Sequence, residues 1–239
     1  NEKNKQLERY IESNLQLENF AHLASHDLRE PMRNIVSFSQ LLAKSGRSKL
    51  DKHELEYLDF IQQGTGRIES LVQDLLAYST ISHSPLSLST FSAPELLEEV
   101  KTDITKLLAD KKGKIIIDKI PVEIVADRSR IYQLFQNLFT NALRYGQTGI
   151  APEIRVSTLE NSNSYHFQVS DNGKGIAPQF HEQIFILFKS LENKSATNSS
   201  GIGLATCRKI AEDHQGKIWV ESAVGQGSTF HFTIAKGFD

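Results

Sequence analysis

The stretch from Asp127 to Tyr145, DRSRIYQLFQNLFTNALRY, decides the fold of the larger part of this chain. Asp127 is a good N-cap, because its carboxylate can accept hydrogen bonds from the first backbone N–H groups of a helix. Apolar residues then recur every three or four positions, which predicts a helix that buries one face. We therefore predict a helix from Arg128 to Tyr145. Its buried stripe consists of Ile131, Leu134, Phe135, Leu138, Ala142 and Tyr145.

Three polar residues lie beside this stripe on one ridge of the predicted helix, namely Asn137, Asn141 and Arg144. Asparagine is a mediocre helix former, so two asparagines one turn apart in a helix interior need a reason. A solvated face would usually carry Glu, Lys or Arg instead. A side-chain carbonyl is a suitable ligand for Mg²⁺, which takes few protein ligands and completes its shell with water and phosphate. The ridge is therefore a candidate metal or nucleotide site.

Strands and helices are predicted to alternate around this helix. A capping-box spacing at Ser92 and Glu95 predicts a helix that carries apolar residues as far as Leu108, and a second helix is predicted from Ile202 to His214, stopped by Gly216. The pattern indicates an α+β sandwich in which an antiparallel or mixed sheet carries helices on one face. The predicted strands are Lys114 to Asp118, Val122 to Ala126, Glu153 to Leu159, Tyr165 to Ser170, Lys217 to Ser222 and Thr229 to Ala235.

Two glycine-containing turns follow this pattern. Asp171-Asn-Gly-Lys-Gly-Ile176 comes directly after a predicted strand, where a carboxylate can accept a hydrogen bond from an exocyclic amine such as that of adenine. Its glycines would let a planar ring approach closely, although an ordinary strand-end turn would look similar. Asn193 to Ser200 has the composition of a mobile loop, and Gly201 to Leu204 then opens a helix whose N–H groups suit phosphate. Tight-turn geometry is sufficient to explain Gly225 and Gly227.

The first 44 residues predict one long helix with a heptad pattern. In that register His26 falls at an outward-facing position, and Pro31 removes the backbone hydrogen bond to the carbonyl of Asp27. A solvated surface histidine, or a metal pair with His22, would also be compatible with this stretch. The a and d positions are Leu7, Tyr10, Leu17, Ala21, Ala24, Leu28 and Ile35, with Asn14 at one a position.

A second helix is predicted from Lys52 to Ile81, after a break at Ser45 to Ser48. Two long helices joined by a short turn form an antiparallel hairpin. Because a hairpin cannot hide both apolar stripes alone, dimerisation into a four-helix bundle is expected, with Asn14 a candidate for fixing the register. The domain boundary is expected within Ile81 to Thr90, where Ser-Pro and polar alternation occur.

Composition narrows the possible partners. The 239 residues include 27 basic and 29 acidic side chains, a formal charge of -2, which favours neither a nucleic-acid surface nor an electrostatic membrane anchor. The single cysteine, Cys207, excludes an internal disulfide and fits a reducing compartment. No apolar run approaches the ~18 residues of a membrane span. Since the sequence begins at Asn1 without a methionine, we expect it to be part of a longer protein.

Taken in order, these motifs resemble the sensor histidine kinases of two-component signalling. The resemblance covers about Phe20 to Ile234 and rests on His26 in its hairpin, the Asn-x-x-x-Asn helix, Asp-x-Gly-x-Gly, the paired Phe185 and Phe188, Gly-x-Gly and Gly-x-Gly-Ser-Thr-Phe. It implies a multidomain chain: a coiled-coil signalling helix over 1–20, an all-α hairpin over 21–84 that forms a dimeric four-helix bundle, and an α+β ATP-binding sandwich of the Bergerat type over 85–239. An upstream sensor domain, a cytoplasmic kinase portion, a homodimer and a response-regulator receiver as partner are implied as well.

The resemblance also implies residue roles, with ATP and Mg²⁺ as cofactors. His26 matches the phosphoacceptor, and Asp27 matches the acid that orients the imidazole and takes its proton. Asn141 matches the Mg²⁺ ligand, supported by Asn137, and Asp171 matches the adenine-reading acid. The implied nucleotide site comprises Asn137, Asn141, Arg144, Tyr145, Asp171, Gly173, Gly175, Ile176, Phe188, Lys189, Gly201, Gly203, Leu204 and Thr229, with Asn193 to Ser200 as the lid over ATP.

Two departures from the family pattern and three rival functions remain. Many members carry Thr or Asn four residues after the histidine, to position water that removes phosphoryl from the partner; here Glu30 would repel that group, which predicts weak phosphatase activity. Gly201-Ile202-Gly203 is poorer in glycine than the richest versions of its box.

A water-hydrolysing ATPase of the gyrase or chaperone type would need a glutamate at Asn137. A non-catalytic scaffold would not need intact nucleotide motifs, and an anti-sigma serine kinase leaves residues 1–80 unexplained.

Overall fold

The structure is a computed structural model that describes residues 31, 33–44, 50–191 and 200–237. The chain divides into two compact units, Asn1–Ser84 and Pro85–Asp239. His26, Asp27, Glu30, the heptad positions before residue 31 and most of the predicted lid therefore lie outside the described residues. No helix in the described part combines the length and the apolar character that a membrane span requires.

The described part of the first unit is helical, as predicted. Residues 33–44 form one helix, and α2 (Lys52–His83) forms the second. A capping box starts α2, because the Asp51 carboxylate accepts from the Glu54 N–H at 2.9 Å and the Glu54 carboxylate accepts from the Asp51 N–H at 2.8 Å. Many large apolar side chains of these two helices remain exposed, including Phe38 and Phe60 at 65% and 68%. The hairpin by itself thus leaves apolar surface in water.

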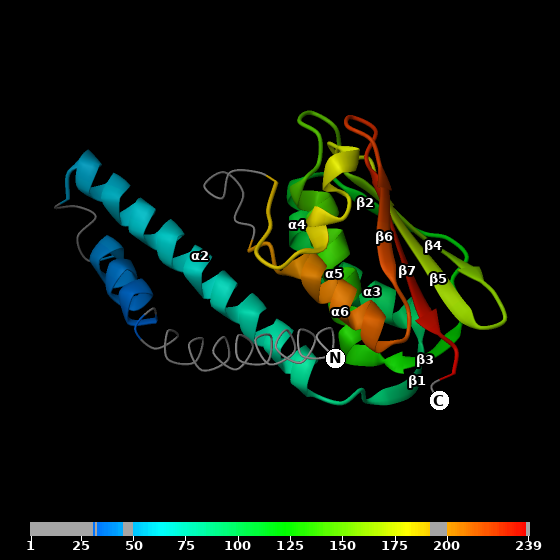
Figure 1. Cartoon of the computed structure of the whole chain (residues 1–239). Coiled ribbons are helices and arrows are strands. Elements are labelled where there is room, and N and C mark those ends of the chain that lie inside the picture. Colours follow the sequence, from blue (N-terminus) through cyan, green and yellow to red (C-terminus); the bar gives the residue numbers. More distant parts are fainter. Residues whose placement is uncertain (1–30, 32, 45–49, 192–199, 238–239) are drawn as a thin grey trace, which may run out of the picture. The chain divides into compact units, whose positions relative to one another are not determined.

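A five-stranded sheet forms the centre of the second unit (Figure 1). Its spatial order is β2 (Lys114–Ile117), β4 (Glu153–Glu160), β5 (Ser164–Asp171), β7 (Ser228–Ala235) and β6 (Ile218–Ser222). The pair β2–β4 is parallel and the other three pairs are antiparallel. The sheet is therefore mixed, which confirms the predicted fold class.

Helices α3 (Ala93–Asp103), α5 (Arg128–Arg144) and α6 (Gly203–Asp213) lie on one face of this sheet (Figure 1). The core is aromatic where α5 meets the sheet. Phe135 contacts Phe167 of β5 and Phe232 of β7 edge-on, with ring centroids 5.6 and 5.3 Å apart, and Phe167 stacks on Phe232 at 5.0 Å. All three rings are fully buried, so this contact fixes the position of α5 on the sheet.

Two elements differ from the prediction. The expected boundary stretch contains a strand, β1 (Leu88–Ser92), which pairs antiparallel with β3 (Glu123–Asp127) in a separate two-stranded sheet. The helix expected as far as Leu108 is interrupted at Ile104, where α4 (Thr105–Asp110) begins. The hydroxyls of Thr102 and Thr105 bond to the carbonyls four residues earlier, and such bonds bend helices. Two short 3-10 helices, η1 (Pro178–Phe180) and η2 (Gln183–Phe185), follow β5.

Asp127 caps α5, as predicted, and also joins distant segments. Its carboxylate accepts from the backbone N–H groups of Ser129 and Arg130, and from that of Ser87 at 3.0 Å. Although burial raises the pKa of Asp127, the hydrogen bonds from Ser87, Ser129 and Arg130 outweigh it and the pKa is lowered. Its own N–H donates to Nε2 of the buried His214 at 3.0 Å, while Nδ1 of His214 donates to the Ile210 carbonyl. His214 is therefore held as a neutral ring.

The end of α6 corrects the predicted role of Gly216. The residue with left-handed backbone after this helix is Gln215, at φ 53°. Gly216 does not supply that conformation. A Cβ atom at position 216 would lie 1.8 Å from the carbonyl oxygen of Thr233, so the close approach of β7 requires a glycine there.

Two buried histidines and one half-buried histidine predict a pH dependence of stability. Burial lowers the pKa of His166, His214 and His231 below the ordinary value. At pH about 6.5 and below, these histidines therefore bind protons more readily in the unfolded chain than in the folded chain. The free energy of unfolding consequently falls as the pH drops from neutrality toward the lowered pKa values. We expect the melting temperature to decrease between pH 7 and about 5.5.

The His214→Gln variant tests the buried site separately. It should melt lower at pH 8, because the bond to Asp127 is altered, but its melting temperature should depend less on pH than that of the unaltered chain. Parallel pH profiles for the two proteins would contradict the assignment to His214.

Candidate nucleotide and metal site

The asparagine ridge of α5 lies against the start of α6. The Nδ2 atom of Asn137 donates to the carbonyl of Gly203 at 3.2 Å, across 66 residues of sequence. Asn137 and Asn141 are half-buried, whereas Arg144, in the last turn of α5, is exposed. Two stretches that the sequence marks as nucleotide-binding candidates, Asn-x-x-x-Asn and Gly-x-Gly, are therefore in contact.

The donor chemistry of this ridge suits Mg²⁺. Because the amide nitrogen of Asn137 bonds to Gly203, its side-chain oxygen is oriented away from that carbonyl. In the part of the chain that the structure describes, the Asn141 side chain makes no hydrogen bond, and no three His, Cys, Asp or Glu residues group as a metal site. Since Mg²⁺ keeps several waters and needs few protein ligands beside phosphate, one or two oxygen donors on this ridge are a sufficient protein contribution.

Asp171 is the last residue of β5 and is half-buried. Its Oδ1 accepts from the Gly173 N–H at 2.8 Å, and the backbone N–H of Ser228 also donates to its carboxylate. Burial raises the pKa of Asp171 above the ordinary value, although both hydrogen bonds act in the opposite direction. A carboxylate has about four acceptor positions, so one that is oriented in this way can still accept a hydrogen bond from a ligand.

The glycines of the Asp171 turn have a reason within the protein. A Cβ atom at Gly175, where φ is +70°, would lie 1.9 Å from the Ala223 carbonyl oxygen of the β6–β7 hairpin. A Cβ atom at Gly173 would lie 2.8 Å from the carbonyl oxygen of Tyr145, at the end of α5. The hypothesis that these glycines make room for a planar ring is therefore not needed to explain them.

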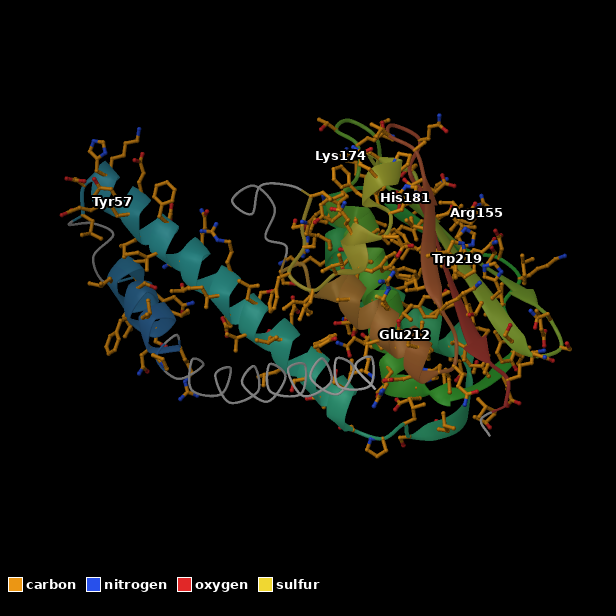
Figure 2. All side chains as sticks on the ribbon, viewed as in Figure 1. Tyr57, Arg155, Lys174, His181, Glu212 and Trp219 are labelled. Carbon is orange, nitrogen blue, oxygen red and sulfur yellow. The ribbon has the colours of Figure 1, made fainter. Side chains whose placement is uncertain are left out.

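Four residues outside the predicted site set hold this turn. Ser222 Oγ accepts from the Ile176 N–H at 2.8 Å, and His181 Nε2 lies 3.1 Å from the Ile176 carbonyl oxygen, which fixes Ile176 on both sides. The other two are Gln147, whose side chain donates to backbone carbonyls, and Asn172. The Asn172 side chain donates to the Ala151 carbonyl and accepts from the Glu153 N–H. Figure 2 shows Lys174 of the turn and His181 at the same end of this unit. Ser222, Gln147 and Asn172 act on backbone groups at least 19 residues away in sequence, which no local pattern reveals, whereas His181 is only five residues from Ile176.

Thr229 does not join the predicted set. It pairs with Ser170 in the β5–β7 ladder, and the two hydroxyls lie 3.0 Å apart. Because side chains alternate along strands, Thr229 lies on the opposite face of the sheet from Phe230 and from the Asp171 side chain. Ser228, one residue earlier, pairs with Asp171 and is the residue of β7 that reaches its carboxylate.

The predicted residues around the lid flank a narrow junction. The Phe188 N–H donates to the Gly201 carbonyl at 2.9 Å, and both residues have left-handed backbones, at φ 63° and 70°. The Phe188 ring is 43% exposed, and Lys189 follows it on the surface. Gly203 begins α6 and Leu204 is its second residue. The start of α6 thus lies between this junction and the Asn137 amide.

Two family descriptions match this chain. Residues 126–237 match the histidine kinase-, DNA gyrase B- and HSP90-like ATPase family. Residues 16–84 match the His kinase A (phospho-acceptor) domain. Cyanobacterial phytochrome A from Nostoc sp. strain PCC 7120 is 36% identical over 225 residues, which are 94% of this chain and 29% of that protein.

Solved structures agree. The catalytic domain of histidine kinase ThkA is 30% identical, with a TM-score of 0.54 over 63% of this chain and 98% of that domain. ThkA in complex with the response regulator protein TrrA is 25% identical, with a TM-score of 0.65 over 97% of this chain and 67% of that one. The chain belongs to the sensor histidine kinases. It spans about 30% of the length of the phytochromes that it matches.

The contact of Gly175 with the β6–β7 hairpin predicts a large effect of one methyl group. Gly175→Ala should destabilise the chain by about 3 kcal/mol or more, because a left-handed alanine is strained and its Cβ collides with a carbonyl. Urea unfolding measures the cost. The control is Gly149→Ala, since Gly149 has φ +79° but nothing within 4 Å of its Cβ position. That control should lose only about 1 kcal/mol, and equal losses in the two variants would contradict the collision.

Proposed function

We propose that this chain is the kinase portion of an ATP-dependent protein-histidine kinase, which phosphorylates His26 and passes the phosphoryl group to an aspartate of a response regulator. The observation that carries the proposal is the hydrogen bond between Asn137 and Gly203, because it joins the ridge proposed to hold the metal to the helix start proposed to bind phosphate. Asp171 supplies a base-reading carboxylate in the same unit. The family match supports the reaction class.

The phosphoryl step needs one nucleophile and one base. A neutral His26 attacks the γ-phosphorus of ATP through Nε2; the bond to the β,γ-bridging oxygen breaks and ADP leaves. The proton on Nδ1 passes to Asp27, which also orients the ring. Transfer of this kind depends mostly on positioning and on charge neutralisation, so a separate unit that presents ATP is sufficient.

The remaining site residues position the nucleotide. Asn141, with Asn137, would hold Mg²⁺, which neutralises phosphate charge when bound. Asp171 accepts a hydrogen bond from the exocyclic amine of adenine. Arg144 contributes positive charge near the phosphates, and the Tyr145 ring lines the pocket. The residues that line or close the site are Gly173, Gly175, Ile176, Phe188, Lys189, Gly201, Gly203 and Leu204.

The exposed apolar side chains of the first unit also bear on how the protein is organised. We propose a signalling helix over 1–20, a phosphotransfer hairpin over 21–84 and a catalytic unit over 85–239. A second copy of the chain would cover the exposed apolar side chains of the two helices in a four-helix bundle. The partners are this second copy, a response regulator, as ThkA has in its complex with TrrA, and a sensor segment in the longer protein.

Phosphorylation of His26 is tested with radiolabelled ATP and Mg²⁺. The protein should acquire a label that is acid-labile and base-stable, as expected of phosphohistidine, and His26→Gln should acquire none. Asn141→Asp and Asp171→Asn should also abolish labelling while the dimer stays intact on a sizing column. Steady release of phosphate without labelled protein would instead favour the water-hydrolysing ATPase.

Glu30 predicts weak phosphatase activity toward the partner. The carboxylate repels the anionic phosphoryl group and does not position water as Thr or Asn would. A receiver domain phosphorylated by this kinase should keep its label almost as long with the wild-type chain as alone, and Glu30→Thr should shorten its lifetime. This expectation would be contradicted if the wild-type chain and Glu30→Ala removed the label from the receiver domain at equal rates, both faster than its spontaneous loss.

A further inference from the structure

Gln147 lies two residues after the C-cap of α5, and its side chain donates to three backbone carbonyls. Nε2 is 3.0 Å from the oxygen of Asn172, 3.0 Å from that of Gly173 and 3.3 Å from that of Gly225. Only the amide nitrogen can donate to carbonyls, and because it carries two hydrogens, one of them is shared between two of the three acceptors. This one side chain therefore ties the loop after α5 to the Asp171 turn and to the β6–β7 hairpin.

One peptide group connects Gln147 to Asp171. The peptide between Asn172 and Gly173 accepts from Gln147 at its carbonyl and donates from its N–H to Asp171 Oδ1 at 2.8 Å. Hydrogen bonds in such a chain polarise and strengthen one another. The carboxylate proposed to read the base is thus oriented by a peptide that Gln147 holds in place.

We propose that Gln147 is a positioning residue for the nucleotide base: it sets the orientation of the Asp171 carboxylate and thereby the preference for a base with an exocyclic amine. This inference rests on the proposed function, in which Asp171 reads adenine. Gln147 acts through Asp171 and needs no contact with the nucleotide. A base that lacks the amine gains nothing from this orientation.

The turn keeps other attachments when Gln147 is changed. Asn172 accepts from the Glu153 N–H at 2.8 Å and donates to the Ala151 carbonyl at 3.0 Å. The Lys174 N–H donates to the Tyr145 carbonyl at 3.0 Å. Loss of the Gln147 donor should therefore leave the turn in place and loosen only the peptide that orients Asp171.

The test compares ATP with inosine triphosphate, which carries a carbonyl in place of the exocyclic amine. Binding of both is measured by calorimetry on the full chain, and the melting temperature of each variant is recorded. The wild-type chain should prefer ATP, and Gln147→Leu should reduce that preference about three- to tenfold, the worth of one hydrogen bond. The matched control is Gln226→Leu. Gln226 is an exposed glutamine of the β6–β7 hairpin, and its side chain makes no hydrogen bond in the described part of the chain. It should keep the wild-type preference.

Two further variants separate this inference from the proposed function. Asp171→Asn should remove the preference for ATP, and the double variant with Gln147→Leu should lose no more than Asp171→Asn alone. The proposed role of Gln147 is overturned, while that of Asp171 stands, if Gln147→Leu keeps the full preference for ATP. The same holds if this variant binds both nucleotides equally more weakly and has a lower melting temperature. If Asp171→Asn itself keeps the preference, the base-reading role of Asp171 fails, and the inference fails with it.

Discussion

The fold of the second unit depends on the hydrogen bonds of Asp127. Its carboxylate starts α5 and holds the Ser87 N–H of the incoming chain, while its own N–H reaches His214 after the end of α6. One residue thus sets where the chain enters the unit, where the central helix begins and where the second helix ends. Each polar group that bonds to Asp127 has a hydrogen-bond partner. A buried hydrogen-bond network in which every group is paired specifies one arrangement of its elements.

The aromatic core extends this constraint to the site. With its start fixed, α5 has one rotation that places Phe135 edge-on against the stacked rings of Phe167 and Phe232. The same rotation places Asn137 beside Gly203. The strands that carry these rings also carry Asp171 and Ser228, which pair at one end of the ladder. Groups that would bind metal, phosphate and base therefore lie on elements locked by packing, as a preorganised site requires.

Local patterns were sufficient for part of this structure. The helix from Arg128 and its cap follow from a 3.6-residue period and one carboxylate, and the mixed sheet with helices on one face follows from the order of the predicted elements. The strand β1 has the sequence LSTFS, which carries little apolar signal, and becomes a strand only through its pairing with β3.

The site was predictable to a similar degree. The candidate residues on α5, on the Asp171 turn and at the start of α6 could be found because each belongs to a local motif. Gln147 could not, since its acceptors lie 25, 26 and 78 residues away. The face of the sheet on which Thr229 lies depends on the register of β7, and a shift of one residue would move it to the other face.

The contact between Asn137 and Gly203 also bears on the choice between phosphoryl transfer to a side chain and hydrolysis. A hydrolytic relative would need a glutamate at this position to activate water. An ionised glutamate cannot donate a hydrogen bond, so it would lose the bond to the Gly203 carbonyl and bring a negative charge to a carbonyl oxygen. The amide of Asn137 is suited to this place because it offers a donor to the α6 start and an oxygen on its other side. Among the described residues, the contact that holds α6 against α5 is therefore made by an amide, which cannot serve as a general base for water.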